Sequence, residues 1–416
     1  MKILSIETSC DETAISILKA EGSFDDLKSP PKFKVLANNL ISQIDVHKEY
    51  GGVFPALAKR EHSKNLIPLL QKTLTDIKSS SRSATHHTVN NDISEVLERE
   101  PELLKLFLEY IPTVKIPEID AISVTQGPGL EPALWVGINF AKALSLVWNK
   151  PLIPVNHMEG HLLASLVSPK SKTQSSKTEK ITFPTIGLLI SGGHTELILT
   201  KEIGSYEKIG QTRDDAIGEA FDKVARMMEL PYPGGPEISK IAQIQREKGS
   251  GSRNTIDKWE KIEIKLPRPM LNTDDFDFSF SGLKTAVLYL IKNLKKENEW
   301  EELPIEIKQK IALEFENSVT EILLKKTQKA IEKYNAKTLI LGGGVIANNY
   351  IRQSFQQFSP SSTELEILMP ETEFSTDNAV MIGIAGYLQY LKLKEKGQLQ
   401  TATDLKKLSA DGNLSF

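Results

Sequence analysis

The chain has 416 residues, of which 40% are hydrophobic and 25% charged, as is typical of a globular protein with a large core. This length favours two domains or two lobes of one fold and excludes a small stapled module. Its 51 basic and 54 acidic residues give a net charge of −3, which excludes a general electrostatic attraction to nucleic acid or to an anionic membrane.

The chain opens on an aliphatic strand pattern without a charged or apolar leader, and no apolar run is long enough to span a bilayer. Cys10 is the only cysteine, which excludes intrachain disulfides and suits a reducing compartment. We therefore expect a cytoplasmic protein with no membrane partner.

In the first part of the chain, short aliphatic runs alternate with amphipathic segments, a pattern that predicts an α/β fold with helices over a buried sheet. The expected strands are residues 2–6, 14–18, 35–41, 121–124 and 152–155, and the expected helices are residues 53–76 and 134–148. Three stretches, at about 21–34, 79–117 and 168–180, are expected to be surface insertions with loop character, the second of which also contains an amphipathic piece at 93–110.

The second part begins in the same style, with a strand, a polar turn and a strand over residues 185–200, which indicates an ancient duplication. Further expected elements are helix 216–228, strand 338–341, a helix from about 347, strand 365–369 and helix 377–391. We expect a first lobe over residues 1–150 and a second over 151–416, with a nucleotide cleft between them and the last helix packing back on the first lobe.

Two histidines, His157 and His161, open a helix after the strand at 152–155. Their spacing of four places both imidazoles on one helix face, within reach of one cation, although paired histidines also serve as caps and core hydrogen-bond partners. Asp377 is the candidate third ligand, with a helix cap as its alternative role. Glu159 lies one place later than the general base of a metalloprotease helix, which disfavours a peptidase.

Glycine-containing turns follow aliphatic strands at residues 191–195 and 342–348, and another glycine pair lies at 233–236. Paired glycines let backbone N–H groups approach phosphate or ribose oxygens, although each cluster alone is also compatible with a simple tight turn. The spacings of Walker A and Rossmann motifs are absent. Together with the acidic turn at 7–12, these clusters favour a nucleotide site.

Motifs in matching order resemble the universal tRNA N6-adenosine threonylcarbamoyltransferase family, over residues 2 to about 391 outside the three insertions. The motifs lie at residues 6–13, 50–55, 60–62, 125–130, 157–161, 191–195, 214–223, 233–236, 278–284, 342–348 and 375–378. The segment Gly218-Glu-Ala-Phe-Asp-Lys223 is more similar to the bacterial and mitochondrial branch than to the archaeal one, and the missing transit peptide favours the bacterial TsaD branch. One departure is Ala56, where the family commonly has Glu.

The resemblance implies the actin/Hsp70/sugar-kinase (ASKHA) fold. It also implies transfer of the threonylcarbamoyl group from threonylcarbamoyl-AMP to N6 of adenosine at tRNA position 37, in tRNAs reading ANN codons, which forms t6A. A divalent ion, Fe(II) or alternatively Zn(II), is implied at His157, His161 and Asp377. The residues implied to bind the adenylate are Ile190, Ser191, Gly192, Gly193, His194, Asp222, Gly235 and Asn348.

An acyl adenylate is already activated, so the reaction needs a proton acceptor for the amine rather than a protein nucleophile. Glu12, Asp11 and His194 are the candidates, and the sequence does not choose among them.

The net charge of −3 and the dispersed basic residues predict that tRNA is bound with help. The resemblance implies three helpers: an inactive TsaB-like paralogue that forms a heterodimer, a TsaE-like P-loop ATPase, and a TsaC-like synthase that supplies the adenylate. Two alternatives on the same fold are a small-molecule kinase or ATPase, and an inactive scaffold paralogue that lacks the histidine pair.

Overall fold

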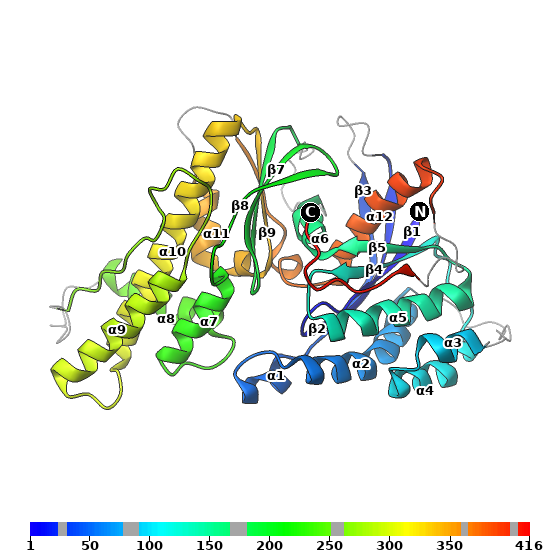
Figure 1. Cartoon of the computed structure of the whole chain (residues 1–416), viewed down its shortest axis with the longest axis horizontal. Coiled ribbons are helices and arrows are strands. Elements are labelled where there is room, and N and C mark those ends of the chain that lie inside the picture. Colours follow the sequence, from blue (N-terminus) through cyan, green and yellow to red (C-terminus); the bar gives the residue numbers. More distant parts are fainter. Residues whose placement is uncertain (24–30, 78–90, 167–180, 251–261, 359–364, 400–406) are drawn as a thin grey trace. The chain divides into compact units, whose positions relative to one another are not determined.

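The computed structural model describes residues 1–23, 31–77, 91–166, 181–250, 262–358, 365–399 and 407–416 (Figure 1). The chain forms two compact units, one of Met1–Lys180 with Asp377–Phe416 and the other of Ile181–Thr376. Each unit is built on a mixed five-stranded sheet. The insertion expected at 168–180 lies outside the described residues.

The sheet of the first unit has the strand order β3-β2-β1-β4-β5. Its strands are β1 (Lys2–Glu7), β2 (Glu12–Glu21), β3 (Lys32–Ser42), β4 (Ala121–Gly127) and β5 (Leu152–Asn156). The first three pair antiparallel, whereas β4 is parallel to both β1 and β5.

The helices of this unit are α1 (Ile44–His47), α2 (Pro55–Asp76), α3 (Asn91–Val96), α4 (Pro101–Tyr110), α5 (Glu131–Trp148), α6 (His157–Leu163) and α12 (Ala379–Glu395), with the 3-10 turns η1 (Lys48–Tyr50), η2 (Ile111–Thr113) and η3 (Ala164–Leu166). Alternation along β1 points Leu4 and Ile6 into a core shared with α2 and α5. Ser5 points to the other face, where α12 covers the sheet. The helix can lie this close because residue 383 is a glycine: a Cβ at Gly383 would be only 2.6 Å from Ser5 Oγ.

The sheet of the second unit has the order β10-β9-β6-β7-β8. Its strands are β6 (Thr185–Ile190), β7 (Thr195–Glu202), β8 (Ser205–Gln211), β9 (Thr338–Gly342) and β10 (Glu366–Leu368). Its helices are α7 (Ile217–Met227), α8 (Gly234–Ser250), α9 (Ser281–Asn298), α10 (Ile305–Tyr334) and α11 (Asn349–Gln356), with the 3-10 turns η4 (Gly344–Ala347) and η5 (Thr372–Phe374). The helices α8, α9 and α10 and the strand β8 were not among the expected elements.

Read from the other edge, the second sheet is β8-β7-β6-β9-β10, the same order as the first sheet. The pairing directions agree as well, because β6, β7 and β8 are antiparallel and β9 is parallel to β6 and β10. Two α/β units with one topology confirm the predicted ASKHA fold and explain the repeated strand-turn-strand pattern. The nucleotide cleft between the lobes stays a prediction.

The first unit continues past residue 150, where the sequence placed the boundary, because β5 completes its sheet by pairing with β4. The last helix, α12, belongs to the same unit. The insertion expected at 79–117 is not only a surface loop: in its described part α4 buries Leu103 and Phe107 completely in the core. None of the described helices is long and apolar enough to cross a membrane.

Candidate functional site

Helix α6 presents the two predicted histidines. It begins at His157 because the side chain of Asn156 accepts hydrogen bonds from the backbone N–H groups of Met158 (2.8 Å) and Glu159 (3.3 Å). Their spacing brings the imidazoles of His157 and His161 together, with ring centroids 4.7 Å apart and planes at 90°.

Asp377 joins this pair from the start of α12. It does not cap the helix, because Asn378 does so by accepting a hydrogen bond from Met381 N at 3.0 Å. Asp377 Oδ1 lies 3.0 Å from His161 Nε2 and 3.3 Å from His157 Nε2. We call His157, His161 and Asp377 the trio, and the structure brings all three together.

The trio has the chemistry and geometry of a divalent-cation site. Two imidazoles and one carboxylate form a donor set used by zinc and by non-haem iron. Its three ligand atoms lie within 4.8 Å of one another, comparable with the separation of about 3.4 Å around a tetrahedral ion with bonds of about 2.1 Å. The histidines are buried and the Asp377 side chain is 20% exposed, so this edge of the site is accessible.

Electrostatics also favours a positive charge at this position. Burial lowers the pKa of His157, but the charges of Asp377 and Glu7 outweigh it and raise that pKa well above its usual value. Burial raises the pKa of Asp377, but His157 and His161 hold it well below its usual value. The carboxylate is therefore ionised and available as a ligand.

Two acidic residues that flank the turn between β1 and β2, Glu7 and Glu12, interact electrostatically with members of the trio. Glu7 is fully buried and its Oε2 lies 3.1 Å from His157 Nδ1. Glu12 is partly buried, and burial together with the negative charges of Asp11 and Asp377 raises its pKa well above the usual value. The sequence pointed to Glu7 only as part of an acidic turn and missed its contact with His157.

The second unit contains the predicted glycine turn between β6 and β7. Ser191 N donates to His194 O at 2.8 Å, and Ser191 Oγ accepts from His194 N at 3.1 Å, which closes the turn. A Cβ at Gly192 or Gly193 would meet no atom within 4 Å, so the chain's own packing does not require glycine there. Open space at both positions is suited to close approach by a ligand.

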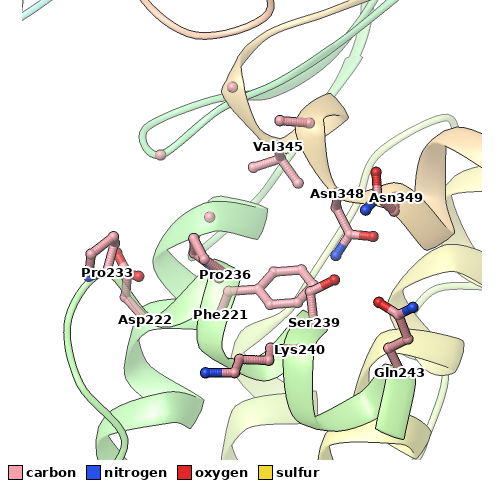
Figure 2. Close-up of a pocket in the computed structure, with 15 residues that line it drawn as sticks. Phe221, Asp222, Pro233, Pro236, Ser239, Lys240, Gln243, Val345, Asn348 and Asn349 are labelled. Carbon is pink, nitrogen blue, oxygen red and sulfur yellow. The ribbon is translucent and has the colours of Figure 1, made fainter. Parts of the chain in front are cut away.

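A cavity of about 460 Å³ adjoins this turn, and Figure 2 shows side chains that line it. Of the residues implied to bind the adenylate, it is lined by Gly192, Asp222, Gly235 and Asn348. The others, Ile190, Ser191, Gly193 and His194, are not among its lining residues.

Asp222 and Asn348 also hold the walls of the cavity. Asp222 Oδ1 accepts a hydrogen bond from Gly234 N at 2.7 Å, next to the start of α8. Asn348 caps α11 by accepting from Ile351 N at 3.0 Å, and its amide nitrogen donates to the buried Glu316 at 2.8 Å.

Sequence reasoning missed most of the wall that α8 contributes. The missed residues are Ser239, Lys240 and Gln243, which continue along α8 from Pro236 at the end of the predicted 233–236 motif. Their spacing of three and four residues marks a single helix face, and that is the signal that was available. The cavity is also lined by residues that were not predicted as ligands: Gly218 and Phe221 of α7, Pro233, Gly344, Val345 and Ala347 of η4, and Asn349 at the start of α11.

Comparison with known proteins gives a consistent result. A family model described as tRNA N6-adenosine threonylcarbamoyltransferase matches residues 34–86 and 101–384, a span that includes the trio and the cavity. A protein of that name from Thermosipho africanus (strain TCF52B) is 41% identical over 408 residues, which cover 98% of this chain and 100% of the relative. Two proteins of the same name are similar over 388 residues each. The one from Thermosipho melanesiensis (strain DSM 12029 / CIP 104789 / BI429) is 42% identical, and the match covers 93% of this chain and 94% of the relative. The one from Staphylococcus haemolyticus (strain JCSC1435) is 39% identical, and the match covers 93% of this chain and 91% of the relative.

Proposed function

Because the chain belongs to the tRNA N6-adenosine threonylcarbamoyltransferase family, we propose that it transfers the threonylcarbamoyl group of threonylcarbamoyl-AMP to N6 of adenosine 37 in tRNAs reading ANN codons. The observation that carries the proposal is the trio, a largely buried His/His/Asp cluster within the span that matches the family. An inactive scaffold has no use for such a cluster, and neither has a small-molecule kinase.

The cavity of the second unit is the proposed site for the AMP half of the substrate. Phe221 and Pro236 offer apolar surface to the base, and Asp222 offers a carboxylate to the ribose hydroxyls. The backbone N–H groups of Gly192 and Gly193 are suited to the phosphate, because no side chain stands in the way. Asn348 positions η4 and α11 around the same ligand.

The reaction forms a bond between N6 of adenosine and the carbamoyl carbon and breaks the bond between that carbon and the phosphate oxygen, so AMP leaves. The amine loses one proton, and we assign it to Glu12, whose raised pKa makes it a stronger base than an ordinary carboxylate. Asp11 acts through Glu12 by raising that pKa. His194 belongs to the β6–β7 turn and is retained as the alternative acceptor.

His157, His161 and Asp377 would hold the divalent ion, Fe(II) in the first place and Zn(II) in the second. When bound, such an ion supplies Lewis-acid stabilisation of negative charge on the threonylcarbamoyl group. The donors themselves are compatible with either metal.

tRNA is the macromolecular substrate that the family implies. The net charge of −3 supports a shared grip on it, with a TsaB-like paralogue and a TsaE-like ATPase as proposed partners. A TsaC-like synthase is the proposed source of the adenylate.

Reconstitution tests the proposal. Purified protein is incubated with L-threonine, bicarbonate, ATP, the synthase and unmodified tRNA, the partners are added one at a time, and the nucleosides are measured by mass spectrometry. We expect t6A to form, and to be lost in a His157→Ala variant. If no t6A forms with every partner present, the transferase proposal is wrong and the kinase alternative gains support.

A further inference from the structure

Glu7 stands out because its buried carboxylate pairs with a histidine of the trio. It is the last residue of β1 and is 0% exposed. Oε1 accepts a hydrogen bond from Ser9 N at 2.5 Å, and Oε2 accepts one from Thr125 Oγ1 at 2.5 Å. The remaining partner of Oε2 is His157 Nδ1, at 3.1 Å.

The hydrogen bond to Glu7 determines which nitrogen of His157 faces the trio. An ionised carboxylate only accepts, so Nδ1 must carry the proton of this bond. In a neutral imidazole the other nitrogen, Nε2, then has a free lone pair, and Nε2 lies 3.3 Å from Asp377 Oδ1. Building on the proposed function, we propose that Glu7 is a positioning residue for a cation bound by the trio, acting by holding His157 with Nε2 directed at that cation.

The two histidines of the trio differ in this respect. His161 Nδ1 is buried and has no hydrogen-bond partner among the residues that the structure describes. His161 therefore depends on its place on α6 and on Asp377 for its orientation, whereas His157 has a carboxylate on each side.

Charge balance gives a second reason. Glu7 and Asp377 together carry two negative charges, and a divalent ion carries two positive ones. A buried cluster of this composition is neutral as a whole, which offsets much of the cost of removing charges from water. With Asp377 alone, a divalent ion on two neutral imidazoles would carry a net charge of +1, which only the less buried carboxylates of Asp11 and Glu12 would be left to offset.

The alternative is that Glu7 is only a structural residue that ties the β1–β2 turn to β4. Zn(II) affinity, measured by competition with a chromophoric chelator, separates the two roles. In a Glu7→Gln variant a neutral amide replaces the carboxylate, so the hydrogen bond from His157 Nδ1 is weakened or lost whichever way the amide faces, and we expect Zn(II) affinity to fall about 10- to 100-fold. Thr125→Val is the matched control, because it removes another hydrogen bond to the same oxygen but leaves the one from His157. We expect its affinity to change by no more than about threefold. Equal losses in the two variants would overturn the proposal.

A measurement on the unmodified chain covers the case in which Glu7→Gln does not fold. Nitrogen-15 spectra of the Zn(II)-loaded protein should show His157 with a protonated Nδ1 and a metal-bound Nε2. The opposite assignment would overturn the inference. If the unmodified chain binds Zn(II) and Glu7→Gln binds it equally well, this inference fails while the metal site of the proposed function stands. If the unmodified chain binds neither Zn(II) nor Fe(II), the proposed metal site and this inference both fail.

Discussion

The turn between the first two strands of the sheet makes different contacts in the two units. In the first unit the turn between the first two strands, residues 8–11, is tied down by neighbouring elements. The carbonyl groups of Ser9, Cys10 and Asp11 accept hydrogen bonds from Leu130 N, His62 Nε2 and Gln43 N, respectively. The corresponding turn of the second unit, residues 191–194, closes on itself and is held from outside by a hydrogen bond from Gly218 N to Ser191 O at 3.2 Å, while its two glycines face open space.

This difference shows how a duplicated scaffold is specialised without a change in strand order. The braced turn keeps charged groups such as Glu7 and Glu12 at defined positions beside the trio, and fixed charges of this kind are what a cation site needs. The bare turn keeps backbone N–H groups accessible, and this is what an anionic ligand needs. The predictions below test whether the division holds.

The Asp377→Ala variant is the most severe test of this division of roles between the two units. Removing one of three ligands should release the cation and lower the rate of t6A formation by about 1,000-fold, as expected when several kcal/mol of charge stabilisation are lost. Metal content and single-turnover rate are the measurements. Asn378→Ala is the control, since it removes the cap of α12, costs about 1 kcal/mol of stability and leaves the ligands in place. Metal retained at full occupancy in Asp377→Ala would contradict the assignment.

Glu12→Gln should lower the transfer rate by about 100-fold and remove the loss of rate at acidic pH. The raised pKa has a second consequence, because a carboxyl group whose pKa is higher in the folded state stabilises the fold only at low pH, and this contribution is lost as the pH rises. The metal-free variant should therefore unfold at a higher temperature than the unmodified chain at pH 8, with the gap closing near pH 4. Glu49→Gln, on the exposed η1 turn, should change neither property.

The hydrogen bond from His62 that holds the turn at residues 8–11 should depend on pH. Burial lowers the pKa of His62 to about 4, so the folded state holds it neutral while it donates to Cys10 O. The unfolded state binds a proton below pH 6.5, and stability is therefore lost as the pH falls from there toward 4. We expect the free energy of unfolding to drop by about 2 kcal/mol more, between pH 7.5 and pH 5, in the unmodified chain than in His62→Gln. Equal slopes in urea titrations would show that His62 does not sense pH.

Local pattern was enough to predict much of the fold. The aliphatic runs that became β1 and β6, and the glycine-bearing turns after β6 and β9, lie where the sequence placed them. The strand at 152–155 was expected with the first part of the chain, but its place in the first sheet, past the boundary expected at 150, follows only from its pairing with β4. The core role of α4 was missed for a similar reason: Phe107 finds its partner in Phe140 of α5.

The trio was predictable because two of its members share a helix face and the third stands at the start of a helix. The contact of Glu7 with His157 was not, since it joins residues 150 positions apart through the parallel ladder of β1, β4 and β5. The α8 wall of the cavity was missed because Ser239 and Gln243 become lining residues only once α8 packs beside α7.

The glycines give the smallest expected effect and the most direct test of the contrast. Gly192→Ala places a methyl group in open space, so stability should stay within about 0.5 kcal/mol, while affinity for AMP should fall about tenfold because that space is meant for the ligand. Gly129→Ala in the first unit should do the reverse. Its φ of +157° is costly for alanine and its Cβ would lie 2.6 Å from Ser9 O, so stability should fall by about 1–3 kcal/mol with AMP affinity unchanged. Thermal unfolding and calorimetric titration with AMP measure both responses. Equal responses of the two variants would mean that the braced turn and the bare turn are not specialised in the way that their contacts indicate.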